Sequence, residues 1–323
     1  LPGATKENHF KSVLELIDVG INVVRSHQFI MLPGAEASNQ KTREQYGLQT
    51  RFRTTPATYD NYHLFGKTFF SPEIDEICVA SNSMTFEEYV ECRSLDLTVE
   101  IFYNNGIFRE LFKFLKLKGV APSLIILKIH ELARNPKSIL AYVYEGFVRE
   151  TKELFKTQEK VEEYIRQPNV IEQYQSGKLG NNEQLVYRAL SFFNHMSELH
   201  NMAFDLSLEI LKNREILNRR EQEYLDELRE FSLLRKRDLF STNFTEKRLF
   251  HYDFVGLKNI NFNTDPLSAY KPKGLSFEIA HTFDQKEHIS KALKTHGVSK
   301  NGLATILCTG THINAFFREA TEV

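Results

Sequence analysis

The chain has 323 residues, 41% of them hydrophobic, which is enough for about two domains with apolar cores. Its 41 lysines and arginines balance 42 aspartates and glutamates, which gives no support to nucleic-acid binding, because nucleic-acid-binding domains are usually strongly basic. Apolar runs are too short to span a bilayer, and Lys6 and Glu7 stand where a signal peptide would be apolar. We therefore expect a cytoplasmic protein with no membrane contact and no evident nucleic-acid partner.

The first residues read as the loop that closes a buried strand. Residues 1–7 are Leu-Pro-Gly-Ala-Thr-Lys-Glu, and the tetrapeptide Leu-Pro-Gly-Ala recurs at residues 32–35. Between the two, helical spacing of apolar residues predicts a helix at 6–19, and β-branched and aromatic residues predict a strand at 21–30. This order is typical of a β/α layer with a parallel sheet, so we expect a fragment whose earlier strands are missing.

Residues 35–71 are polar and contain glycine and proline, which predicts a long surface loop with an extended piece near 49–54. A short strand is expected at 74–80. Thr85 and Glu88 form a capping box that opens a helix continuing through Tyr103.

Residues 108–237 are almost wholly helical in pattern, with breaks at glycine and proline that divide them into four or more helices. Segment 212–238 is dense in charge, and a solvated helix face is favoured there over a coiled-coil contact. Beyond residue 242 the pattern predicts strands at 249–255 and 275–282 and a helix at 284–295. The tail at 302–323 fits either a strand or a helix, and its run 302–312 is typical of a buried strand leading into a turn, with an anion cradle as the alternative.

These patterns divide the chain into residues 1–70, 71–240 and 241–323. Cys78, Cys92 and Cys308 are far apart, which predicts buried free thiols and no disulfide framework. His195, Glu198 and His200 share one predicted helix, but histidines five residues apart do not share a helix face, so no metal site is expected there.

The loop, helix and strand of residues 1–34 resemble the C-terminal end of the radical SAM barrel. Four later segments resemble the radical SAM proteins that also contain a cobalamin-binding domain. They are Thr-Arg-Glu-Gln-Tyr-Gly-Leu at 42–48, Arg-Phe-Arg at 51–53, Phe-Glu-Glu-Tyr at 86–89 and Val-Glu-Ile-Phe-Tyr-Asn-Asn-Gly at 99–106. The resemblance is best over residues 1–120 and vaguer afterwards.

The resemblance implies a partial (β/α) barrel remnant, followed by a mostly α-helical region and a small α+β C-terminal unit. It also implies that both Leu-Pro-Gly loops face the active site, because barrel enzymes build their sites at the C-terminal ends of strands. The residues that would contact S-adenosylmethionine are Leu1, Pro2, Gly3, Met31, Leu32 and Pro33. The alternative is that both loops are only strand-to-helix turns. Ala4 departs from the glutamate usual in the family, which weakens a polar role for the first loop.

The resemblance further implies a [4Fe-4S] cluster and cobalamin, with a reaction such as methylation of a small-molecule substrate. The C-x3-C-x2-C triplet that holds the cluster is absent from this sequence, and the three cysteines do not have its spacing. In the family, the triplet and the cobalamin-binding domain lie upstream. The expected partner is therefore the missing N-terminal half, and this part alone is expected to be inactive and to hold none of the three cofactors.

Alternation along the predicted strand 21–30 sends Arg25 and His27 to one face and Ser26 and Gln28 to the other. We expect His27 or Gln28 to contact substrate, with structural hydrogen bonding as the alternative. Two other functions stay open. One is a non-catalytic helical scaffold or interaction module, and the other is a degenerate barrel that binds a partner or nucleotide without a cluster.

Overall fold

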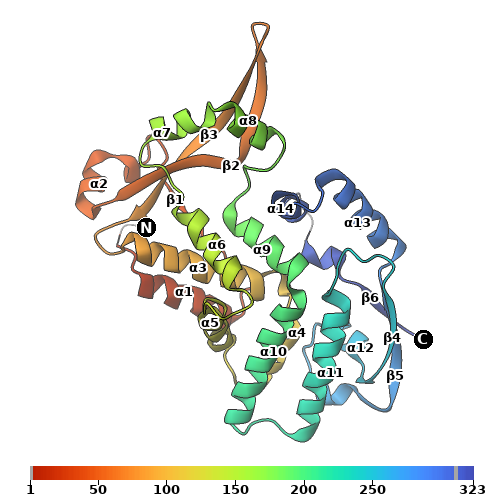
Figure 1. Ribbon diagram of the computed structural model, residues 1–323. Coiled ribbons are helices and arrows are strands. Elements are labelled where there is room, and N and C mark those ends of the chain that lie inside the picture. The colour runs from red at the N-terminus through yellow and green to blue at the C-terminus, as the bar shows by residue number, and fades with distance from the viewer. Residues whose placement is uncertain (1–2, 309–311) are drawn as a thin grey trace.

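The computed structural model describes residues 3–308 and 312–323, and it shows a mixed α/β protein with a helical body and two small antiparallel sheets (Figure 1). Within the described residues there is neither a closed barrel nor a parallel pair of strands. The described helices include none with both the length and the apolar content that a bilayer span requires.

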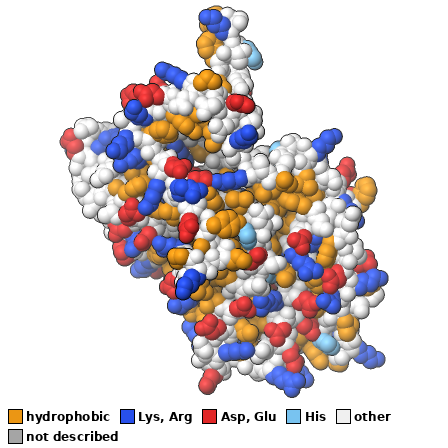
Figure 2. Space-filling model, viewed as in Figure 1, with side chains coloured by type: hydrophobic (Ala, Val, Ile, Leu, Met, Phe, Trp, Pro, Cys, Tyr) orange, Lys and Arg blue, Asp and Glu red, His pale blue; other side chains and the backbone are white. Residues whose placement is uncertain are grey.

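The first sheet has the order β1-β3-β2, and its strands are β1 (Phe29–Ile30), β2 (Gln49–Leu64) and β3 (Lys67–Ala80). Before the sheet comes α1 (Lys6–Val19), and η1 (Glu36–Ser38) and α2 (Gln40–Tyr46) connect β1 to β2. Strands β2 and β3 form a hairpin whose outer half projects from the body (Figures 1 and 2).

Helix 6–19 is confirmed, and Gly20 ends it with a left-handed φ of 95°. The strand predicted at 21–30 is mostly wrong, because only Phe29 and Ile30 pair with β3 and the preceding residues have no strand beside them. The long loop predicted at 35–71 is also wrong, since β2 and the start of β3 occupy much of it. The outer half of the hairpin is exposed on both faces, so its sequence lacks the alternation of apolar and polar residues that marks a half-buried strand.

The helical body begins with α3 (Phe86–Phe102), which is buried along most of its length and contacts α1, α5, α6 and α9. Its predicted capping box between Thr85 and Glu88 is confirmed. The remaining elements of the body are η2 (Asn104–Gly106), α4 (Arg109–Leu117), α5 (Pro122–Ala133), α6 (Ala141–Lys152), α7 (Gln158–Ile165), α8 (Pro168–Gln175), α9 (Glu183–Asn194), α10 (Met196–Asn213) and α11 (Arg219–Lys236).

The C-terminal elements surround a second sheet of order β4-β5-β6. They are β4 (Thr245–Tyr252), α12 (Phe254–Asn259), η3 (Pro266–Ala269), β5 (Tyr270–Ala280), α13 (Phe283–His296), α14 (Lys300–Cys308), η4 (Ile313–Phe316) and β6 (Glu319–Glu322). The strand predicted within 302–312 is wrong, because residues up to Cys308 form a helix. Gly302 lets this helix approach α13, since a Cβ there would lie 2.2 Å from the carbonyl oxygen of His296. The turn predicted after it falls partly on residues 309–311, outside the described residues.

One hydrophobic cluster runs from α1 to η4 and includes residues on both sides of position 240. The fully buried guanidinium of Arg318 adds a polar link between these regions. It donates hydrogen bonds to the carbonyl oxygens of Leu234, Arg237 and Asp238, and so satisfies the acceptors at the end of α11. The C-terminal sheet is therefore tied to α11 by both apolar packing and hydrogen bonds.

Candidate functional site

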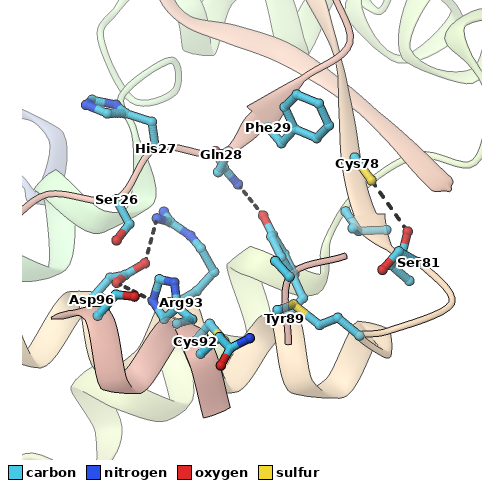
Figure 3. A pocket seen from close by; sticks show the side chains of 17 residues that line it. Ser26, His27, Gln28, Phe29, Cys78, Ser81, Tyr89, Cys92, Arg93 and Asp96 are labelled. Atoms are coloured by element: carbon cyan, nitrogen blue, oxygen red, sulfur yellow. Dashed lines mark hydrogen bonds and ion pairs between the residues drawn. The ribbon is translucent and has the colours of Figure 1, made fainter. Parts of the chain in front are cut away.

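A cavity of about 410 Å³ lies between the start of α1, residues 26–29, the end of β3 and the start of α3 (Figure 3). Its walls are largely apolar and include Phe29, Val79 and Met84. Ala4, which follows the first Leu-Pro-Gly loop, also lines it, and the carbonyl oxygen of Ala4 accepts a 2.8 Å hydrogen bond from the hydroxyl of Ser83. The cavity thus joins the first loop and the segment predicted as a barrel strand.

The side chains of residues 26–29 alternate in direction, although most of this segment is not in the sheet. In Figure 3 the side chains of Ser26 and Gln28 point toward α3, whereas the imidazole of His27 points away from Tyr89. The Gln28 amide donates a 2.7 Å hydrogen bond to the hydroxyl of Tyr89. Both residues predicted to contact substrate therefore line the cavity, with Gln28 directed into it and His27 at its edge.

Helix α3 supplies the polar side of the cavity through Tyr89, Cys92, Arg93 and Asp96, which share one helix face by their spacing. The imidazole of His9 on α1 bonds the Asp96 carboxylate at 2.9 Å. These α3 residues were missed in the sequence-based prediction. The helix itself was predicted, but its sequence does not single out these four positions, because other polar residues such as Glu87 and Glu91 stand on the same helix.

Arg93 is buried and connects the cavity to α9. Its guanidinium donates to the side chains of Gln184 at 2.9 Å and Glu183 at 3.2 Å. Burial disfavours the charge on Arg93, but Glu183, Tyr89 and Asp96 together outweigh this effect and raise the pKa of Arg93. Burial likewise opposes ionisation of Glu183, while Arg93 and Arg53 lower its pKa. The network is therefore charged in the folded protein.

A second cavity of about 310 Å³ lies on the other side of Gln28 and is more polar. Arg53 lines it and lies 3.3 Å from the Glu183 carboxylate. Thr151 also lines it, and this hydroxyl is buried without a hydrogen-bond partner among the described residues. Gln28 thus stands between an apolar and a polar cavity, which suits an elongated ligand with two unlike ends.

The cysteines of the site do not suit an iron–sulfur cluster. Burial raises the pKa of the thiols of Cys78 and Cys92, in the case of Cys92 to about 12, so both are protonated at neutral pH. Clusters require thiolates, and no group of three metal-binding side chains occurs in the described residues. The side chain of Cys308 lies outside the described residues.

Of the six residues implied to contact S-adenosylmethionine, the four that the structure describes do not line the cavity. Leu1 and Pro2 lie outside the described residues, and Gly3 is exposed with a φ of 78°. Met31 is buried, and its backbone N–H donates to the carbonyl oxygen of Glu76. Leu32 is 61% exposed and Pro33 is also exposed. The described members of this set therefore lie beside the cavity and do not line it.

His195, which precedes α10, and His200 within it lie away from the cavity lining. His195 contacts the hydroxyl of Tyr142. His200 is fully buried and bonds the carbonyl oxygen of Met196 and the hydroxyl of Ser232. Burial lowers the pKa of His200 to about 3, so its imidazole is neutral and structural.

No model of a known protein family matches the chain, and no curated protein matches it either. The site must therefore be interpreted from its own chemistry. Its hydroxyls, amides and apolar walls can hold a ligand and exclude water from it, while its two thiols are protonated.

Proposed function

We propose that this chain is the C-terminal, substrate-binding part of a radical SAM enzyme, and that the cavity at Gln28 holds a small-molecule substrate. The proposal is supported by the resemblance of residues 1–120 to cobalamin-binding radical SAM proteins. The single observation that carries it is that one cavity brings together Ala4, which follows the first Leu-Pro-Gly, and His27 and Gln28, which precede the second. Helix α3 lines the same cavity.

In the proposed site, Gln28 orients the substrate. Its amide nitrogen is held by the Tyr89 hydroxyl, which leaves its Oε1 atom to accept a hydrogen bond from a ligand. Phe29 and Val79 bury the apolar part of the ligand and keep water away from it. The buried network of Arg93 and Glu183 fixes the position of Arg93 in the polar wall of the cavity.

In the intact enzyme, S-adenosylmethionine, a [4Fe-4S] cluster and cobalamin would supply the radical and methyl-transfer chemistry. The described residues do not fit the cluster, so the proposal assigns its cysteines to sequence upstream of this chain. It also assigns residues 21–30, of which only Phe29 and Ile30 form a strand here, to the last strand of a partial (β/α) barrel. The Leu-Pro-Gly at residues 32–34 supports this assignment.

The proposal is tested on the full-length product of the gene. We expect the upstream reading frame to contain a C-x3-C-x2-C triplet within about 200 residues, and the anaerobically reconstituted protein to bind iron and cleave S-adenosylmethionine to 5′-deoxyadenosine. Substitution of the three cysteines by alanine is the control, and it should abolish both the binding of iron and the formation of 5′-deoxyadenosine. A full-length protein without the triplet would end the proposal.

A second candidate is the non-catalytic interaction module, which the projecting hairpin favours. Phe65 at its turn is 98% exposed and Leu64 is 55% exposed, although most large apolar side chains are buried. Under this alternative the chain alone should be a stable monomer that elutes as one symmetrical peak in size-exclusion chromatography, and 5′-deoxyadenosine should not form.

A further inference from the structure

A third cavity, of about 240 Å³, is lined by three cations from one face of α4. Arg109, Lys113 and Lys116 are spaced by four and three residues, which places them side by side along the helix. Asn22 lines this cavity, whereas residues 26–29 line the candidate substrate cavity. The two cavities therefore lie at opposite ends of the same extended segment.

The charges of these three cations are not neutralised by carboxylates. Arg109 donates to the amide oxygen of Asn261 at 3.4 Å, and Lys113 donates to the amide oxygen of Asn263 at 2.7 Å. Lys116 donates to the backbone carbonyl oxygen of Asp18 at 3.4 Å. All three acceptors are uncharged, and none of the three cations forms an ion pair within the described residues.

The carboxylate of Asp18, the residue whose carbonyl oxygen bonds Lys116, is already engaged. The Asp18 carboxylate accepts hydrogen bonds from the backbone N–H of Ser123 at 3.0 Å and from its hydroxyl at 2.7 Å, at the start of α5. This position also favours the carboxylate through the helix dipole, and the carboxylate forms no ion pair with the three cations within the described residues. The cavity therefore keeps a net positive charge.

The walls that hold the cations are fixed by local geometry. The hydroxyl of Tyr103 donates to the carbonyl oxygen of Ile21 at 2.7 Å, which joins the end of α3 to the segment after α1. Gly106 has a φ of 65°, and a Cβ there would lie 2.9 Å from the Arg109 guanidinium. The absence of a side chain at Gly106 thus leaves Arg109 free to lie at the cavity.

We propose that this cavity binds a small phosphate-bearing molecule. Phosphate oxygens accept several hydrogen bonds at once, and arginine and lysine are the side chains that most often bind them. The amides of Asn22 and Asn261 and the ring of Phe112 offer contacts to an attached uncharged group. A volume below the roughly 300 Å³ of typical ligand pockets restricts the ligand to one or two phosphates and a group the size of a sugar.

The test uses inorganic pyrophosphate as the probe in isothermal titration of the full chain at low ionic strength. Substitution of all three cations, Arg109→Gln, Lys113→Gln and Lys116→Gln, is expected to weaken binding at least 10-fold. The matched control replaces three exposed lysines elsewhere, Lys41→Gln, Lys137→Gln and Lys212→Gln, and should leave binding within 2-fold. Circular dichroism verifies that both variants are folded.

Two outcomes would overturn the proposal. One is an equal loss of affinity in both variants, which would mean that only net charge matters. The other is the absence of heat from millimolar pyrophosphate when vesicles of phosphatidylglycerol do bind, which would identify the cations as a membrane contact. Neither outcome depends on radical SAM chemistry, so this test and that of the proposed function are separate.

Discussion

The side chain of Asn104 forms hydrogen bonds with both backbone groups of Val24. Its Oδ1 atom accepts from the Val24 N–H at 2.9 Å, and its Nδ2 atom donates to the Val24 carbonyl oxygen at 2.8 Å. A neighbouring strand would satisfy the same two groups in the same way. Since Asn104 is fully buried and Val24 nearly so, this amide supplies the hydrogen-bond partners of Val24, the one buried residue of segment 21–30, where no strand lies beside it.

Substitution Asn104→Ala is expected to lower the free energy of unfolding by about 2–5 kcal/mol, because two buried backbone groups lose their partners. Urea denaturation followed by circular dichroism measures the change. The control is Asn169→Ala at an exposed position, expected to change stability by less than about 0.5 kcal/mol. A similarly small loss for the Asn104 variant would show that water replaces the amide.

Substitution Gln28→Ala is expected to reduce product formation by the intact enzyme at least 10-fold while changing stability by less than about 1 kcal/mol. The reason is that, among the residues described, the Gln28 side chain bonds that of Tyr89 alone and otherwise faces the cavity. His27→Ala, at the cavity edge, should have a smaller effect. Turnover assays and thermal unfolding of both variants measure the difference, and equal activity of the Gln28 variant and the wild type would argue against the assigned site.

The stability of the protein should fall as the pH drops below about 6.5. Burial lowers the pKa of His130 to about 3, as it does that of His200, so both imidazoles are neutral in the folded state. Between pH 3 and 6.5 the unfolded chain binds protons that the folded chain does not, so each histidine removes up to about 1.4 kcal/mol per pH unit.

This pH dependence is measured by urea denaturation between pH 5.5 and 6.5, about one pH unit or more above the ordinary pKa values of carboxylates. His200→Gln retains hydrogen-bonding capacity and should reduce the slope of stability against pH. An unchanged slope in this variant would mean that His200 is protonated in the folded state.

Substitution Phe65→Asn is expected to stabilise the hairpin turn. Phe65 and Gly66 form a two-residue turn with φ values of 52° and 72°, a conformation that Asn-Gly adopts most readily. The gain should be about 0.5–1 kcal/mol, since the left-handed region is strained for phenylalanine. Slower hydrogen exchange of the adjacent amides would show it. Phe69→Asn, within β3, is the matched control and should speed exchange, because asparagine is unfavourable in strands.

Local signals in the sequence predicted the elements whose ends are set by neighbouring residues. The capping box of Thr85 and Glu88 and the stop at Gly20 each lie within one turn of the helix end that they determine. The hairpin was missed because its outer strands bury no face. The helix ending at Cys308 was predicted as a strand because periodicity alone does not distinguish short apolar runs.

The candidate site was predictable only in part for a similar reason. Gln28 could be nominated from the alternation of one short segment. Arg93 could not, because its significance depends on Glu183, which is 90 residues away in the sequence. Contacts over such separations are set by the packing of α3 against α9, which one sequence without its fold does not reveal.

The outer half of the β2–β3 hairpin predicts where homologous chains differ in length. Because its strands pair mainly with each other there, an equal number of residues can be inserted into or removed from each strand without moving a core side chain. Changes of two residues per strand also preserve which face each remaining side chain occupies. Homologous chains are therefore expected to vary most in the length of the outer half of this hairpin, by two residues per strand at a time. The inner half of the hairpin, next to the body, should keep its length.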